Sequence, residues 1–103
     1  MTNQVFLVGR INKLELINRE DKKIVNMTIS VPRAYKNVEG VYETDYITCQ
    51  LYNSIADNVM DYCHDNDIVG VKGRLETDKN GVLIVAAEKV TFLASKSEHD
   101  KGV

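Results

Sequence analysis

The sequence predicts an all-β domain of five strands with one helix between the third and fourth strands. Five segments alternate apolar with polar residues, which is the pattern of strands with one buried face. One segment, residues 55–64, instead has apolar residues at helical spacing. With 103 residues, the chain is long enough for one hydrophobic core and too short for two.

The first predicted strand, residues 4–11, has apolar side chains on both faces. Leu7 and Ile11 belong to one face, and Phe6 and Val8 belong to the other. The second face of such a strand is covered either within the domain or by another subunit, so this strand predicts self-association.

The second strand, residues 24–31, has the clearest alternation, with Val25, Met27 and Ile29 directed toward the core. Pro32 is predicted to close this strand, because proline has no N–H group for the hydrogen-bond ladder. Residues 33–44 are predicted to form a long loop or an extended hairpin tip.

Residues 46–52 form the third predicted strand. Ile47, Cys49 and Leu51 alternate toward the core, so Tyr46 and Tyr52 face the solvent. Exposed aromatic rings can stack against another flat ring. Nucleic-acid bases can stack on them in this way whatever the base sequence. The alternative is that one or both tyrosines cover the edge of the core and keep their hydroxyl groups in water.

A helix is predicted at residues 55–64, with Ser54 as its N-cap and Asp57 three residues further on. Residues 65–67 are predicted to form a turn. The helix therefore connects the third strand to the fourth.

The fourth strand, residues 68–76, directs Lys72 and Arg74 outward. The dipeptide Asn80-Gly81 then predicts a tight hairpin turn into a fifth strand at residues 82–93. Three strands, a helix and a hairpin make the plan of an OB-fold, a five-stranded Greek-key barrel with one helix between strands 3 and 4. A β-sandwich is the competing architecture, but it normally has more strands and no central helix.

Residues 1–94 are predicted to form this domain, and residues 95–103 a short flexible C-terminal tail. The chain has no long apolar run and no basic, apolar leader, which predicts a cytoplasmic protein without a membrane partner. Cys49 and Cys63 fall at core positions, which favours buried free thiols over a disulfide.

The formal net charge of -2 is unevenly distributed along the chain. Residues 54–67 contain four acidic residues and no lysine or arginine, which leaves 13 basic against 11 acidic residues elsewhere. A basic groove is therefore compatible with the acidic total.

The sequence contains no catalytic or metal-binding pattern. His64 and His99 lie far apart without a paired nucleophile, and the two cysteines lack the spacing of metal ligands. The segment at residues 70–73 has its glycines and lysine in the wrong order for a phosphate loop. These observations predict a protein that is not an enzyme and needs no metal or cofactor.

Several segments resemble the bacterial single-stranded DNA-binding proteins. They follow the family's order over nearly the whole chain, at residues 5–11, 27–33, 45–52, 56–59, 69–77 and 87–93. The resemblance implies binding of single-stranded DNA with little sequence preference, by base stacking in a basic groove. The residues that it assigns to the groove are three tyrosines and five cations: Tyr35, Tyr46, Tyr52, Arg10, Arg33, Lys36, Lys72 and Arg74. The alternative for any single cation is a solvated surface charge.

Three features depart from the family pattern. The chain has no tryptophan, its loop between strands 4 and 5 is short, and residues 95–103 lack the linker and acidic tip through which relatives recruit replication proteins. Recruitment by that route is therefore not expected. These features also resemble the primosomal replication protein N group, which consists of dimeric barrels of similar length.

The sequence thus predicts a homo-oligomer that binds single-stranded DNA in DNA replication, recombination or repair, with a tetramer favoured over a dimer. The alternative is a primosomal or replication-complex OB-fold protein that acts mainly through protein–protein contacts.

Overall fold

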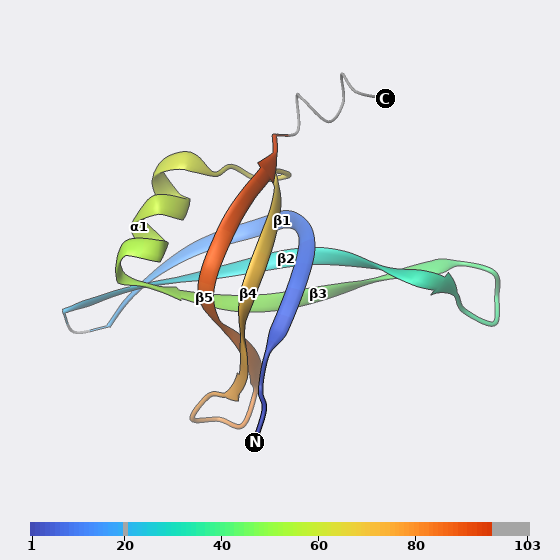
Figure 1. Cartoon of the computed structure of the whole chain (residues 1–103), viewed down its shortest axis with the longest axis horizontal. Coiled ribbons are helices and arrows are strands. Elements are labelled where there is room, and N and C mark those ends of the chain that lie inside the picture. Colours follow the sequence, from blue (N-terminus) through green and yellow to red (C-terminus); the bar gives the residue numbers. More distant parts are fainter. Residues whose placement is uncertain (20, 96–103) are drawn as a thin grey trace.

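A computed structural model of the chain describes residues 1–19 and 21–95 and shows a closed five-stranded barrel (Figure 1). The elements are β1 (Val5–Arg19), β2 (Lys22–Lys36), β3 (Tyr42–Tyr52), α1 (Asn53–Tyr62), β4 (Ile68–Thr77) and β5 (Leu83–Ala94). The strand order is β1-β2-β3-β5-β4, and β3 and β5 form the parallel pair. The predicted order of five strands and one helix is confirmed. All of the predicted tail except its first residue lies outside the described residues.

The interior of the barrel is filled by the alternating apolar residues of the strands. Val25, Met27 and Ile29 on β2 are fully buried, as are Cys49 and Leu51 on β3. Complete burial of a side chain such as Ile29 stabilises the fold by roughly 1.5–3 kcal/mol. The core faces predicted for these two strands are therefore confirmed.

Both cysteines are buried and neither forms a disulfide, as the sequence predicts. Burial raises the pKa of the Cys49 thiol to about 12, because a thiolate would lose its hydration in the core. Cys49 therefore acts as a small apolar side chain at neutral pH.

β1 is longer than predicted because a β-bulge interrupts its alternation. The pairing of β1 with β2 shifts register between Ile11 and Lys13. Before the bulge the buried residues of β1 have odd numbers, whereas Leu14 packs against the core from an even-numbered position. The prediction that the strand ends at residue 11 is wrong, because the extra residue at a bulge moves later side chains to the other face.

β2 and β3 continue past the barrel as a two-stranded ribbon, which projects to the right in Figure 1. We call the ribbon of residues 32–45 the arm. Pro32 does not close β2, contrary to the prediction, since it pairs with Thr44 and the strand runs on to Lys36. A register shift follows Pro32, in keeping with the preference of proline for irregular positions in sheets.

The β2–β3 and β4–β5 hairpins end in turns of the same design. At the tip of the arm, Asn37 N–H donates to Val41 O at 2.9 Å, and Gly40 adopts a φ of 79°. In the β4–β5 turn, Asp78 N–H donates to Val82 O at 2.9 Å, and Gly81 adopts a φ of 80°. The β4–β5 hairpin is therefore confirmed, with the glycine of its Asn-Gly pair in the left-handed region where glycine carries no steric cost.

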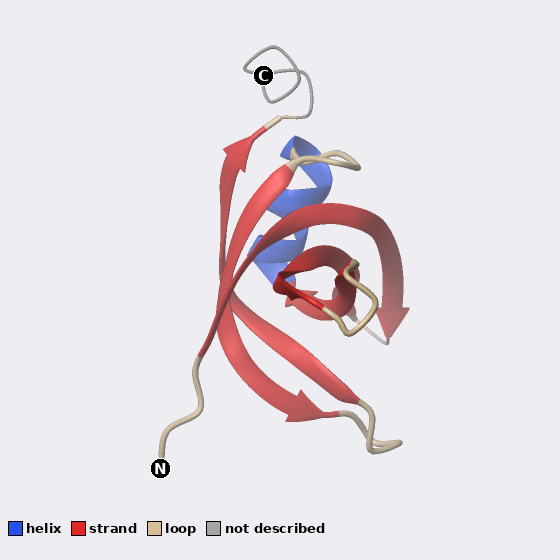
Figure 2. Ribbon diagram, turned by 90° about the vertical axis from the view of Figure 1, so that its right-hand side faces the viewer, coloured by secondary structure: helices blue, strands red, loops and turns tan. Residues whose placement is uncertain are grey.

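α1 packs against β2, β3 and β5 and buries Ala56 and Val59 (Figure 2). The helix begins at Asn53, two residues earlier than predicted, because Asn53 adopts a φ of 54° and turns the chain sharply out of β3. The predicted N-cap at Ser54 is wrong, since the cap position is Tyr52 and no side chain caps the helix there. Within residues 1–19 and 21–95, no helix is long and apolar enough to cross a membrane.

Candidate nucleic-acid interface

The outer face of β1, β2 and β3 brings an arginine and a tyrosine into one row. Arg10 on β1 pairs with Ser30 on β2, and Ser30 pairs with Tyr46 on β3. Residues directly opposite one another in a sheet share a face, and neighbouring strands are about 4.8 Å apart. Tyr46 is 64% exposed, so its ring is available to a partner that also reaches Arg10. The structure thus unites two of the predicted binding residues.

The same face continues with a row that the sequence analysis missed. Lys13 pairs with Thr28, and Thr28 pairs with Thr48. Lys13 also forms an exposed ion pair with Glu15 at 3.3 Å. Lys13 escaped prediction because it follows the bulge in β1, beyond the predicted end of the strand. Its signal in the sequence was the renewed alternation of Leu14 and Leu16.

A second missed residue, Tyr42, lies on the arm. It pairs with Lys36, whose Nζ atom is 5.6 Å from the centroid of the Tyr42 ring. Tyr42 is 58% exposed and lies four residues before Tyr46 in the same strand, so both rings are on one face of β3. Extending the alternation of the third strand backwards through Thr44 would have found it.

Arg33 has partners other than those predicted. Its guanidinium donates from Nε and Nη2 to Asp45, at 3.1 Å and 2.9 Å, and its Nη1 lies 2.9 Å from Glu43. The hydrogen bond from Arg33 holds the pKa of Asp45 below its usual value. Asp45 pairs with Val31, so this cluster lies on the face of the ribbon opposite to Tyr46. Arg33 is therefore neutralised by its neighbours instead of being free for phosphate.

Tyr35 is 65% exposed and directly precedes Lys36 in β2. Successive side chains of an extended strand point to opposite faces, which places Tyr35 on the face away from Lys36 and Tyr42. Its phenol also contributes to the raised pKa of Arg33, after the larger effects of Asp45 and Glu43. Tyr35 and Lys36, which the resemblance assigns to one groove, thus lie on opposite faces of the arm.

Tyr52 and Arg74 come together in a groove between β3, β5 and β4. The groove has a volume of about 420 Å³ and includes Glu76 and Glu88 in its lining. Tyr52 is half-buried and donates its hydroxyl hydrogen to Gln50 Oε1 at 2.6 Å. Arg74 Nε lies 2.7 Å from Glu76 Oε2. This groove has mixed charge, unlike the row at Tyr46.

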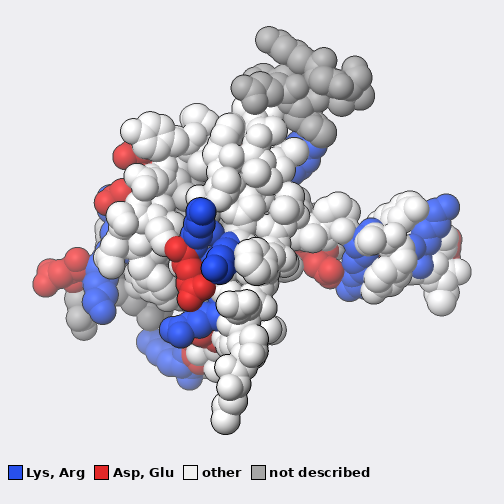
Figure 3. Space-filling model, in the orientation of Figure 1, with Lys and Arg blue, Asp and Glu red and all other residues white. Residues whose placement is uncertain are grey.

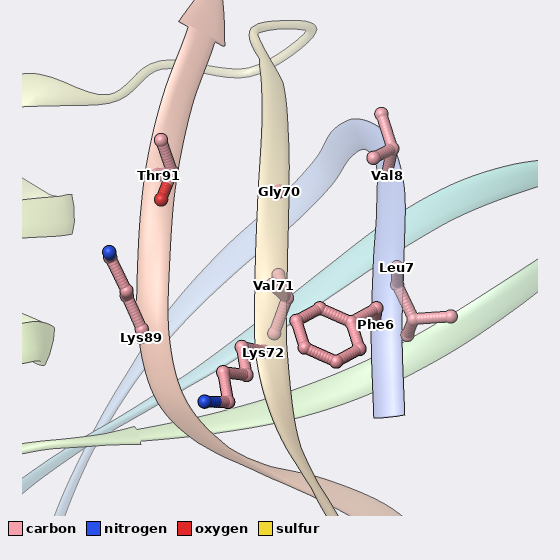
Figure 4. Close-up of a pocket in the computed structure, with 8 residues that line it drawn as sticks. All are labelled: Phe6, Leu7, Val8, Gly70, Val71, Lys72, Lys89 and Thr91. Carbon is pink, nitrogen blue, oxygen red and sulfur yellow. The ribbon is translucent and has the colours of Figure 1, made fainter. Parts of the chain in front are cut away.

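Lys72 lies on a third surface, which β1, β4 and β5 form together. Its Nζ atom is 5.8 Å from the centroid of the Phe6 ring. Lys72, Phe6 and Lys89 line a cavity of about 410 Å³, which is drawn in Figure 4. Figure 3 shows basic and acidic side chains interspersed over the molecule, without one continuous basic surface in this view. The eight predicted residues are therefore spread over several surfaces, and only Arg10 and Tyr46 share a row.

A family model described as the single-strand binding protein family matches residues 2–92. The chain belongs to this family. It is 35% identical over 106 residues to single-stranded DNA-binding protein B of Bacillus subtilis, an alignment that covers 93% of this chain and 94% of the relative. A single-stranded DNA-binding protein of Halalkalibacterium halodurans is 32% identical, over 99% of this chain and 67% of the relative. The family takes its name from binding and not from a reaction, in agreement with the prediction that the protein is not an enzyme.

Solved structures of family members share the barrel. The small single-stranded DNA-binding protein of Streptomyces coelicolor superimposes with a TM-score of 0.71 at 17% identity, over 90% of this chain and 95% of the other. The second such protein of Mycobacterium smegmatis gives a TM-score of 0.71 at 18% identity, over 96% and 93%. The predicted OB-fold is therefore confirmed.

Proposed function

We propose that the protein binds single-stranded DNA with little sequence preference along the outer face of β1, β2 and β3. The observation that carries this proposal is the row of Arg10, Ser30 and Tyr46, which places an exposed ring and a cation on one face, two strands apart. A ring accepts any base by stacking, and a cation on the same face neutralises the phosphate backbone. The names of the Bacillus subtilis and Halalkalibacterium halodurans relatives support the same ligand.

The remaining predicted residues lie away from this row. Lys36 continues the surface onto the arm, Tyr35 lies on the other face of the arm, and Lys72, Tyr52 and Arg74 lie further round the barrel. Arg33 has a structural role, because two carboxylates already hold it. Residues 1–94 act as the binding domain, in the cytoplasm, during DNA replication, recombination or repair.

The salt dependence of oligothymidylate binding tests the proposal. For single strands, the slope of log K against log salt is about -0.7 per phosphate neutralised. Arg10→Gln is therefore expected to weaken binding and make the slope less steep by about 0.7. Lys22→Gln is the matched control, because this exposed lysine lies beside the β1–β2 turn. Equal slopes for the wild type and Arg10→Gln would remove Arg10 from the binding surface.

We also infer that the protein self-associates through the outer face of β1, β4 and β5. Phe6 and Val8 are 70% and 59% exposed there, and Leu93 on β5 is exposed beside Gly70, the partner of Val8. Apolar surface of this kind is normally covered in a soluble protein. One self-complementary face produces a dimer, and the tetramer favoured by the sequence needs a second interface.

Phe6→Glu is expected to shift the protein to monomers, because burying a carboxylate in an apolar interface costs hydration that its cross-strand neighbour Lys72 only partly restores. Analytical ultracentrifugation would measure the mass. Tyr62→Glu is the control, since Tyr62 on α1 is equally accessible to solvent. If Phe6→Glu keeps the mass of the wild type, the oligomer uses another face.

The groove at Tyr52 favours a second candidate function, namely a replication-complex protein that acts mainly through protein contacts. Glu76 and Glu88 line this groove and suit a basic peptide better than phosphates. In that case oligothymidylate would not bind at any salt concentration, and the titration above decides between the two functions.

A further inference from the structure

A small polar pocket lies on the outer face of β1, β2 and β3, beside the row of Tyr46. It has a volume of about 170 Å³, and its lining consists of Lys13, Glu15, Asn26, Thr28 and Thr48. Thr48 lies two residues after Tyr46 in β3, and side chains two residues apart along a strand share a face. The pocket therefore belongs to the surface proposed for DNA.

An unsatisfied oxygen atom lies at this pocket. Asn26 Oδ1 is buried, and no group within residues 1–19 and 21–95 donates a hydrogen bond to it. Buried carbonyl oxygens are nearly always hydrogen-bonded, because an unsatisfied one raises the free energy of the folded state. Lys13 and Glu15 are 65% and 50% exposed, so their side chains can turn aside for a ligand. A ligand with an N–H group would then supply the missing hydrogen bond.

Glu15 and Lys13 add an acceptor and a donor beside Asn26. Glu15 is the cross-strand partner of Asn26, and Glu15 Oε2 lies 3.3 Å from Lys13 Nζ. A carboxylate only accepts hydrogen bonds, and an ammonium group only donates them. The three groups therefore present two acceptors followed by one donor. The hydroxyl groups of Thr28 and Thr48 can donate or accept, so they do not change this order.

Guanine is the base whose Watson–Crick edge complements this order. Its N2 amino group and N1–H are two adjacent donors, and O6 beside them is an acceptor. Adenine and cytosine each have a single donor group on this edge, and the one donor of thymine lies between two acceptors. The ion pair of Lys13 with Glu15 can persist beside guanine, because the ammonium group has three hydrogens and the carboxylate has two oxygens.

We propose that this pocket selects guanine at one position of the bound strand, with Asn26 and Glu15 accepting hydrogen bonds from the base and Lys13 donating to O6. This inference rests on the proposed function, and it adds a preference at one nucleotide to binding that otherwise has little sequence preference. Two residues of β3 span about 7 Å, so the pocket takes a neighbour of the base that stacks on Tyr46.

An oligothymidylate of about 16 nucleotides in which one central thymine is replaced by guanine tests the proposal. The wild type is expected to bind it roughly fivefold more tightly than the all-thymine oligomer, which is the lower end of the discrimination that a good bidentate contact gives. Hypoxanthine lacks the N2 amino group, so an oligomer with hypoxanthine in place of guanine should lose part of this gain. Fluorescence anisotropy of labelled oligomers would measure the affinities.

Two substitutions separate the contributions of the pocket residues. Glu15→Gln replaces one acceptor oxygen by an amino group and is expected to abolish the preference for guanine. Asn26→Ala removes the acceptor for the N2 amino group, so this variant should bind the guanine and hypoxanthine oligomers equally well. Glu15 is exposed, so Glu15→Gln should unfold at the temperature of the wild type and keeps the test valid if Asn26→Ala is unstable.

Asp61→Asn is the matched control, because it removes the same charge from an exposed position on α1 and should keep the preference for guanine. The proposal is overturned if the wild type binds the guanine and all-thymine oligomers alike, or if the preference survives in Glu15→Gln. Oligothymidylate binding with a salt slope that depends on Arg10 would still support the proposed function in both cases. Absence of oligothymidylate binding would overturn that function itself, so the two failures are distinguishable.

Discussion

Replacing Tyr46 with alanine is expected to weaken binding to oligothymidylate by roughly 1–3 kcal/mol, which is a loss in affinity of about 5- to 150-fold. The Tyr46 ring lies in the row with Arg10, to which the proposed function assigns both the stacking of a base and a phosphate contact. Removal of the ring deletes the stacking surface and leaves the backbone of β3 unchanged. Quenching of tyrosine fluorescence or anisotropy of a labelled oligonucleotide would measure the difference.

Tyr62→Ala provides the matched control for this experiment. Tyr62 is the last residue of α1 and is 74% exposed, slightly more than Tyr46. The control should bind as tightly as the wild type, whereas Tyr46→Phe should lose little because the ring remains. If Tyr46→Ala and Tyr62→Ala bind alike, Tyr46 is not a stacking residue.

Gly73→Ala is expected to cause the largest loss of stability, about 3 kcal/mol or more, at or beyond the upper end of the usual cost of overpacking. A Cβ atom at residue 73 would lie 2.2 Å from Ala86 O and 3.0 Å from Ala86 C. Both are backbone atoms of β5, so relief requires the two strands to separate. The register of β4 and β5 shifts at Gly73, where this close approach is built in. Urea denaturation would measure the change in free energy of unfolding.

Gly70→Ala is the control in the same strand. A Cβ atom there would lie 3.7 Å from Leu93 Cδ1, which is an ordinary van der Waals contact. This variant should unfold within about 1 kcal/mol of the wild type, since Gly-to-Ala changes without strain have small effects. If Gly73→Ala were as stable as Gly70→Ala, β4 and β5 would be able to move apart at residue 73 with little loss of free energy of unfolding.

Much of the fold could be predicted because burial imposes a period of two on strands with one covered face. Val25, Met27 and Ile29 keep that period without interruption, and β2 was predicted with the correct buried face. The bulge between Ile11 and Lys13 is different, because its effect depends on pairing with β2. The alternation of β1 therefore breaks at the bulge, although the ladder with β2 continues from Lys13 to Arg19.

The candidate site was harder to predict because it depends on which strands are neighbours. Tyr46 was found from exposure alone, and its position in a row with Arg10 emerged only from the pairing of three strands. Arg33 is a different case, since its charge suggested a phosphate contact, whereas in the structure it forms ion pairs with Glu43 and Asp45. The sequence shows which side chains could bind DNA, and the pairing of the strands determines which side chains lie next to them.

The closure of the barrel has a consequence for its internal motions. β3 and β5 are joined through two residue pairs among the described residues, Cys49 with Val85 and Gln50 with Ala86. This seam has the fewest ladder hydrogen bonds to break, so amide hydrogen exchange should report local opening here before the rest of the barrel. Such breathing would widen the groove beside Tyr52 and leave the row at Tyr46 assembled, because β1 and β2 hold that row from the other side.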